Sequence, residues 1–364
     1  MTSNANFNKN NLDCLRLILA SIVACFHIYA LTNIAAFSAF GHLSPHFAVR
    51  GFFVISGLLI YRSYTRSSSV RSYFEKRVRR IYPAYFTVVV LAAVVLFPLS
   101  TVSVSQYLGT GFWRYLAANL VFLNFAAPTL PGVFASHINS AVNGALWTLK
   151  IEVAFYLFVP VLHNLCCRFG TKRVLLVLLG LSSFWKYGFW LLEVSHRAGL
   201  GYSIGLSPSL IARLEVQFPA QLAYFCMGIL LLLYFDKLKS HFLSLSCITG
   251  ILFLIDHFFT GELLDLFWIA GLVFVFGFWH YFGNVSKYGD FSYGVYIVHW
   301  PILQILVSLG ASKLNPALFL PLVLSLIGLA AFLLWHLVEK RFLATSSHYL
   351  KVEKKSTAAA ITVT

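Results

Sequence analysis

Residues 12–37 read LDCLRLILASIVACFHIYALTNIAAF, and this stretch decides the fold class of the chain. Apart from Asp13 near its start, Arg16 and His27 are set in residues that are apolar or weakly polar. A helix needs about 20 apolar residues to cross a bilayer, so the stretch is long enough for one membrane span. Eleven residues at about 100° each bring the second basic side chain back to within about 20° of the first, after a rise of about 16 Å. Arg16 and His27 are therefore expected on one face of a membrane helix, three turns apart.

A basic side chain inside a span needs a physical reason. A cation in the hydrocarbon region costs at least about 2.5–3.5 kcal/mol, so it normally faces an interior cavity and has a functional role. The alternative is that Arg16 reaches from the helix end to the interface, while a neighbouring carbonyl satisfies His27. Taken alone, the pair suggests a functional site without deciding it.

The composition places most of the chain in a membrane. Hydrophobic residues make up 59% of the 364, charged residues 11%, and the mean hydropathy is +0.79. A soluble domain of this length could not bury so much apolar surface, which predicts an all-α integral membrane protein with about ten transmembrane helices. The polar start leads directly into the first span, so no cleavable signal peptide is expected. The six cysteines lie in or beside apolar segments and show neither a disulfide framework nor metal-ligand spacing.

Apolar segments separated by short polar loops predict the individual spans. They cover residues 12–37, 46–64, 81–100, 144–165, 174–194, 214–235, 241–259, 264–282, 292–311 and 317–338. The third span is expected to begin at Ile81, after the basic stretch 62–80, because Pro83 suits a first helical turn. Residues 112–127 are apolar but too few to span, so a re-entrant or interfacial segment is expected there.

Positive charges decide the expected topology. If 112–127 does not span, most Lys and Arg residues fall on the side of the N-terminus, in segments such as 62–80 and 168–173. Positive loops stay in the cytoplasm, so both termini are expected there. Residues 1–342 are expected to form one transmembrane domain, and residues 343–364 a basic, disordered cytoplasmic tail. The net charge of +15 is thereby attributed to topology and membrane lipids, with no role for nucleic acid.

Four stretches carry a resemblance to a known family. They are Arg16 with His27 eleven positions on, FFVISGLLI (52–60) followed by KRVRRIYPAY (76–85), ALWTLKIEVAFYLFVP (145–160), and YGDFSYGVYIVHWP (288–301). With the closing VEKRF (338–342), their order and spacing resemble the acyltransferase-3 family of membrane O-acyltransferases. Thr148 departs from the family pattern, which more often has serine there, but it keeps the hydroxyl.

The resemblance implies an enzyme of the bacterial inner membrane that needs no metal. Family members are thought to take an acyl group, usually acetyl, from acyl-CoA in the cytoplasm. They deliver it to a sugar hydroxyl of an extracytoplasmic polysaccharide or of its lipid-linked oligosaccharide precursor. The partners implied are therefore acetyl-CoA, the glycan acceptor and membrane lipids.

The family pattern also assigns the donor site. Arg77 and Arg80 match its Arg-x-x-Arg pattern and would bind the CoA phosphates, because arginine offers bidentate geometry to phosphate. Free amides at a helix start at Ile81 would add to this anion site. Arg16 would bind CoA or polarise the thioester carbonyl. The alternative is that these charges serve only topology and contact with anionic lipids.

Three further residues are site candidates, two of them for the transfer itself. His27 matches the family's proposed catalytic histidine, either as a base for the acceptor hydroxyl or as a nucleophile that carries the acyl group. Glu152 follows the Trp-Thr-Leu sequence and has either a functional role or a basic partner on another helix. Both residues are expected roughly 10–12 Å below the outer surface, facing a common cavity. His299 is a cofactor-binding candidate by resemblance alone, and a packing histidine is its alternative.

A secondary transporter for an anionic substrate or glycan precursor is the alternative function. It would also place Arg and His within spans. It predicts paired broken helices in inverted repeats, and the sequence gives no sign of either.

Overall fold

The computed structural model describes residues 7, 9–197, 207–283, 285–344, 347 and 349–350, and all regular structure within them is helical. Within these residues, seven helices are long and apolar enough to cross a membrane, or eight if the bent pair Ala35–His42 and Pro45–Thr65 counts as one span. The expected all-α membrane protein is thus confirmed, whereas ten spans and cytoplasmic termini stay predictions. Most of the expected tail, including everything beyond residue 350, lies outside the described residues.

The chain divides into two compact units, each assembled from separate segments. Unit 1 comprises Met1–Leu12, Val49–Tyr73 and Ile151–Phe282. Unit 2 comprises Asp13–Ala48, Phe74–Lys150 and Gly283–Thr364. The single domain expected over residues 1–342 stays a prediction.

Unit 1 is built around the close contact of two helices. Its elements are α3 (Pro45–Thr65, from Val49 on), α7 (Trp147–Phe169, from Ile151 on), α8 (Thr171–Arg197), α9 (Pro208–Glu215), α10 (Phe218–Leu233), α11 (Phe235–Ser240), α12 (Phe242–Ile255), the π-helical turn η5 (Asp256–Thr260) and α13 (Asp265–Phe278). A Cβ on Gly57 of α3 would lie 2.0 Å from the carbonyl oxygen of Phe225, and one on Gly228 of α10 would lie 2.0 Å from that of Val54. Small residues therefore allow the two backbones to touch.

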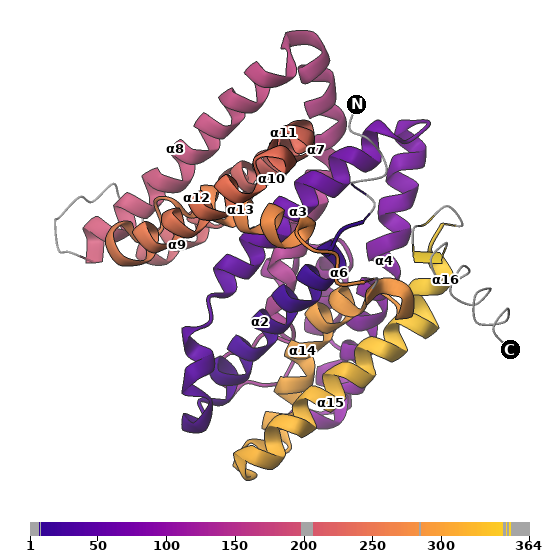
Figure 1. Cartoon of the computed structure of the whole chain (residues 1–364). Helices are drawn as coiled ribbons and strands as arrows, with labels where there is room; N and C mark the ends of the chain where they lie inside the picture. Colours follow the sequence, from indigo (N-terminus) through magenta and orange to yellow (C-terminus); the bar gives the residue numbers. More distant parts are fainter. Residues whose placement is uncertain are drawn as a thin grey trace, which may run out of the picture. The chain divides into compact units, whose positions relative to one another are not determined.

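Unit 2 carries the first and last long helices of the chain. Its elements are α2 (Leu12–Thr32, from Asp13 on), η1 (Ala35–His42), α4 (Val70–Val95, from Phe74 on), η2 (Phe97–Leu99), α5 (Val104–Tyr107), α6 (Thr110–Leu120), η3 (Asn124–Ala126), η4 (Gly144–Leu146), η6 (Val285–Tyr288), α14 (Phe291–Ser308), η7 (Ala311–Lys313), α15 (Pro316–Leu334), the π-helical turn η8 (Trp335–Glu339) and α16 (Lys340–Phe342). Helices α14 and α15 pack side by side (Figure 1), and Gly294 faces Ala331 at the contact.

Two helix boundaries differ from those expected. Helix α2 ends at Thr32 and not at Phe37, because Asn33 adopts a left-handed conformation with φ of 52°. Helix α4 begins at Val70 and not at Ile81, so much of the basic stretch is helical. Lys and Arg are good helix formers, and Arg79 pairs with Glu75 one turn earlier at 2.8 Å. Pro83 consequently lies inside a helix.

The segment 112–127 forms the short helix α6 and the turn η3. The 11 residues of α6 rise about 17 Å, well short of the roughly 30 Å hydrocarbon core. Likewise, the expected eighth span is represented by α13, which has only 14 residues. The position of both helices relative to a bilayer stays a prediction.

Candidate active site

Helix α14 organises the polar residues of unit 2. Asp290 caps its first turn, accepting hydrogen bonds on Oδ1 from the backbone N–H of Ser292 at 3.2 Å and from its hydroxyl at 2.5 Å. This carboxylate is only 3% exposed. Its other oxygen is therefore free to accept from groups on other helices.

Two of the expected site residues meet on that second oxygen. Asp290 Oδ2 lies 2.8 Å from Nη1 of Arg16 on α2 and 2.5 Å from Nη2 of Arg80 on α4. Arg80 also contacts Glu339 at 2.5 Å through Nη1. We call Arg16, Arg80, Asp290 and Glu339 the arginine cluster. Its two guanidinium groups and two carboxylates balance in charge.

The charge state of Asp290 follows from this pairing. Burial alone would raise the pKa of the carboxyl, but the guanidinium groups of Arg16 and Arg80 outweigh it and hold the pKa below its usual range. Tyr349 adjoins the cluster, accepting from Arg16 at 3.3 Å and donating to Asp13 at 3.2 Å. Burial raises the pKa of Tyr349 well above its usual value, so this phenol stays neutral.

The two candidate histidines also meet. Nδ1 of His27 on α2 lies 2.9 Å from Nε2 of His299 on α14, and the two ring planes are within 10° of each other. Nδ1 of His299 lies 3.1 Å from the backbone oxygen of Val295. The edge of the Trp300 ring system packs on His27 with 4.7 Å between centroids. His299 is fully buried, whereas His27 is half-buried.

The third family stretch packs on the same helix. The hydroxyl of Thr148 lies 2.7 Å from that of Tyr296, and Asn143 donates to the backbone oxygen of Ile297 at 2.8 Å. Gly144 fits against the ring of Trp300, where a Cβ would come within 2.5 Å. The hydroxyl at position 148 thus joins two family stretches, and threonine supplies it as serine would.

The loop before Gly144 is anchored on α14 as well. Gln304 donates through Nε2 to the backbone oxygens of Asn139 and Ala141, at 2.6 and 2.9 Å. His137 Nδ1 lies 2.7 Å from Gln304 Oε1, and the indole N–H of Trp300 donates to Ala141. The loop is thereby held to the helix that carries His299.

The structure corrects one expectation about the donor site, that of free amides at Ile81. Ile81 lies in the interior of α4, so its amide belongs to a helical turn and cannot serve a free anion-binding start. Arg80 lies in the arginine cluster, while Arg77, one turn earlier, is half-buried.

Glu152 falls in unit 1, where Oε1 accepts from the hydroxyl of Tyr156 at 2.7 Å. Its shared cavity with His27 stays a prediction.

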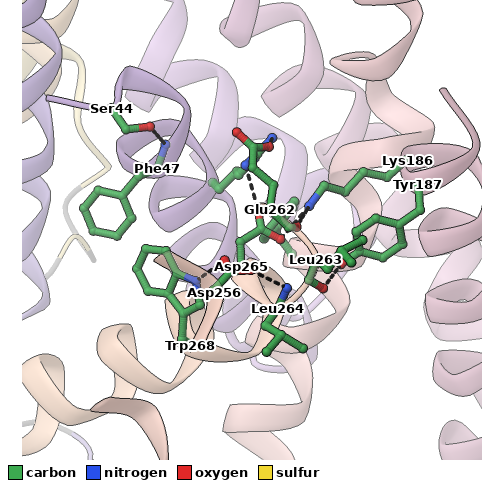
Figure 2. A network of polar contacts seen from close by, with 12 residues as sticks. Ser44, Phe47, Lys186, Tyr187, Asp256, Glu262, Leu263, Leu264, Asp265 and Trp268 are labelled. Atoms are coloured by element: carbon green, nitrogen blue, oxygen red, sulfur yellow. Dashed lines mark hydrogen bonds and ion pairs between the residues drawn. The ribbon is translucent and has the colours of Figure 1, made fainter. Parts of the chain in front are cut away.

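Sequence reasoning missed a second buried charge network, in unit 1. Asp265 accepts from Arg50 and from Lys186 at 2.5 Å each, and from the Tyr224 hydroxyl at 2.6 Å. Glu262 contacts Arg50 at 2.6 Å. Figure 2 shows Lys186 reaching toward Asp265. The partners are far apart in sequence, so their spacing gives no signal of the network.

Asp256 organises the neighbouring turn of unit 1. Its Oδ1 accepts from the backbone N–H of Leu264 at 2.9 Å, and its Oδ2 accepts from the indole of Trp268 at 2.8 Å (Figure 2). Both bonds span the connection from η5 to α13. This carboxylate therefore has a clear structural task.

With this geometry in place, the comparison with known families is decisive. The family model described as "Acyltransferase domain" matches residues 9–336. The chain belongs to the acyltransferase-3 family. The match includes Arg16, His27, Arg80, Asp290 and His299, so it contains the histidine pair and all of the arginine cluster except Glu339, which lies just beyond its end.

Known proteins are similar to the chain, two of them over most of its length. "Nodulation protein 10" of Rhizobium leguminosarum bv. viciae is 28% identical over 83% of this chain and 85% of that protein. "O-acetyl transferase" of Shigella phage Sf6 is 29% identical over 95% of this chain and 99% of that protein. "Putative acetyltransferase ORF330" of Acidianus two-tailed virus is 32% identical over 50% of this chain and 48% of that protein. No solved structure matches the chain.

Proposed function

We propose that this protein transfers an acyl group, acetyl in the simplest case, from acyl-CoA to a sugar hydroxyl of an extracytoplasmic polysaccharide or its lipid-linked precursor. Family membership and the relative named "O-acetyl transferase" support acyl transfer to oxygen. The cytoplasmic donor, the outer acceptor, the inner-membrane location and ten spans with both termini inside belong to this proposal. The hydrogen-bonded pair of His27 and His299 carries it.

Acyl transfer to a hydroxyl needs a group that removes the hydroxyl proton. Imidazole is suited to this because its ordinary pKa is near the working pH. The hydroxyl oxygen bonds to the thioester carbonyl carbon, the carbon–sulfur bond breaks, and CoA leaves as a thiolate that takes up a proton. That is direct transfer. In the alternative route through an acyl-histidine, the His27 nitrogen first bonds to the thioester carbon as CoA leaves, and the hydroxyl oxygen then bonds to the same carbon as the carbon–nitrogen bond breaks.

The arginine cluster supports an acyl-CoA site at the end of these helices away from the histidine pair. Arg16 and His27 lie on one helix, about 16 Å apart along its axis. Asp290 and His299 repeat this order along α14. A guanidinium has five N–H donors, so Arg16 and Arg80 keep donors beyond their carboxylate bonds. Because Arg16 and Arg80 are already paired with carboxylates, attraction for the CoA phosphates falls also to Arg77 and the adjoining basic residues.

A transfer assay in membrane vesicles tests the proposal. With radiolabelled acetyl-CoA and polysaccharide from cells that lack this gene, the wild-type protein should label the glycan. His27→Ala should lower the rate by at least about 100-fold, because a positioned base contributes that much. His257→Ala is the control, since His257 is exposed on η5. Labelling that persists in His27→Ala, or that is missing in the wild type, contradicts the proposal.

Glu152 gives a second test of the same assay. Glu152→Gln should cut transfer severely and leave acetyl-CoA binding nearly unchanged, because we propose that the carboxylate acts on His27 or the acceptor. Tyr156→Phe is the matched variant, since it removes only the hydroxyl that donates to Glu152. Full transferase activity in Glu152→Gln would exclude this role.

A further inference from the structure

We infer that His299 is a positioning residue that fixes His27 as the tautomer with its proton on Nδ1 and its lone pair on Nε2. The inference rests on the proposed function, and it names the atom that removes the hydroxyl proton. It follows from three hydrogen-bonding positions in a row: the Val295 carbonyl, the His299 ring and the His27 ring.

The first position is unambiguous. A backbone carbonyl only accepts hydrogen bonds, so Nδ1 of His299, 3.1 Å from the oxygen of Val295, must carry a proton and donate it. Val295 and His299 lie four residues apart on α14, so the helix itself fixes this contact. The tautomer of His299 is therefore set by its own helix.

The second position follows from burial. His299 is 0% exposed, and a second proton would make it a buried cation, which is costly without a paired anion. The ring is therefore neutral, and its Nε2 is an acceptor. Nδ1 of His27, 2.9 Å away, must then be the donor.

The third position is the reactive one. With its proton on Nδ1, neutral His27 has its lone pair on Nε2, the nitrogen that points away from His299. His27 as a whole is half-buried, whereas His299 is fully buried. Trp300 packs against the ring and limits its rotation.

The transfer step keeps the pair intact. The hydroxyl proton moves to Nε2 of His27, and the resulting imidazolium still donates from Nδ1 to the lone pair of His299. That hydrogen bond stabilises the positive charge while the oxygen attacks the thioester carbon and CoA leaves. An uncharged acceptor here does what a carboxylate does in other catalytic arrangements, where it orients the imidazole and selects its tautomer.

The same contacts argue against a donor-binding role for His299. Both of its ring nitrogens are engaged, one by Val295 and one by His27. A fully buried ring with both nitrogens occupied has no polar atom to offer to CoA. Its substitution should therefore lower kcat and leave the KM for acetyl-CoA unchanged.

Three substitutions of His299 separate the roles of its two nitrogens. The amide of Gln reaches the position of Nε2, so its oxygen can accept from His27. The amide of Asn reaches only the position of Nδ1 and can keep the bond to Val295. Leu keeps neither bond. All three are measured for kcat, for KM with acetyl-CoA and for thermal stability.

We expect His299→Gln to retain kcat within about tenfold, and His299→Asn and His299→Leu to lose about 100-fold or more, with KM changed less than about twofold. An Asn variant as active as the Gln variant overturns the inference. So does a rise in KM at unchanged kcat, which would make His299 a donor-binding residue.

A spectroscopic measurement on the wild type is independent of variant folding and of activity. In protein labelled with ¹⁵N-histidine, protonated and bare ring nitrogens resonate far apart, and the His27 signals are assigned by their loss in His27→Gln. We expect a protonated Nδ1 and a bare Nε2, the less common tautomer of free histidine. A proton on Nε2 overturns the inference even if transfer is active. Absent transfer with the expected tautomer contradicts only the proposed function.

Discussion

Two buried aspartates, Asp290 and Asp265, each pair with two basic side chains from other helices. Asp290 accepts from two guanidinium groups with one oxygen and caps its helix with the other. Asp265 similarly serves Arg50 and Lys186. In a low-dielectric interior, losing such a shared anion leaves one buried cation without its carboxylate partner and another with a single carboxylate, so these aspartates carry more stability than an ordinary ion pair does.

Removing the charge of Asp290 should therefore be costly. We expect Asp290→Asn to destabilise the protein by about 3–5 kcal/mol, the range for breaking a buried pair. Glu75→Gln is the control on an exposed pair with Arg79 of the same general type, and it should cost less than about 0.5 kcal/mol. Thermal unfolding in detergent measures both. Equal melting temperatures for the two variants would contradict this account.

The sequence points to several of the buried basic residues but to few of the acidic residues that pair with them. Arg16, His27, Arg80 and His299 were all singled out, because polar groups are conspicuous in apolar spans. Asp290 lies within a family stretch, but local spacing does not reveal its contact with Arg16, which is 274 residues away in sequence. The pairing of His27 with His299 is also a tertiary fact.

Among the helices, close contact depends on glycine. Gly57 and Gly228 let α3 and α10 touch backbone to backbone, because small residues in a span permit close helix contact. The start of α4 was harder to predict. The charged stretch before Ile81 suggests a loop. However, Lys and Arg have high helix propensity, and the helix begins eleven residues earlier, at Val70.

The glycine contact predicts a sharp difference between two equal substitutions. Gly57→Ala should destabilise the protein by roughly 1–3 kcal/mol, because the added methyl group would collide with the Phe225 carbonyl and force the helices apart. Gly180→Ala on α8 is the control, since a Cβ there meets nothing within 4 Å. It should leave stability unchanged or raise it by up to about 1 kcal/mol. A neutral Gly57→Ala would mean that α3 and α10 are not in contact.

At the scale of the whole molecule, the sequence predicts the fold class but not how the helices are grouped into units. Composition alone required a helical membrane protein. The division into two units, each drawn from separated segments, cannot be read from hydropathy, because every span looks alike to that measure. Positive charges still support a definite orientation, which the helices by themselves do not determine.

Reporter fusions test that orientation. A reporter after Arg71 or Lys172 should be cytoplasmic and one inserted near His137 should be extracytoplasmic, because the basic segments stay inside. A cytoplasmic signal at this site would mean that 112–127 spans, and the ten-span topology would have to be abandoned.

The pairing of the first helix with one near the end of the chain has a consequence for biosynthesis. His27 leaves the ribosome 272 residues before His299, which is roughly half a minute at 5–20 residues per second. During that interval Arg16 waits in or beside the bilayer without Asp290, at a cost of about 2.5–3.5 kcal/mol. A nascent or prematurely terminated chain therefore exposes an uncompensated cation to lipid. Quality-control proteases could recognise it until translation has passed α14.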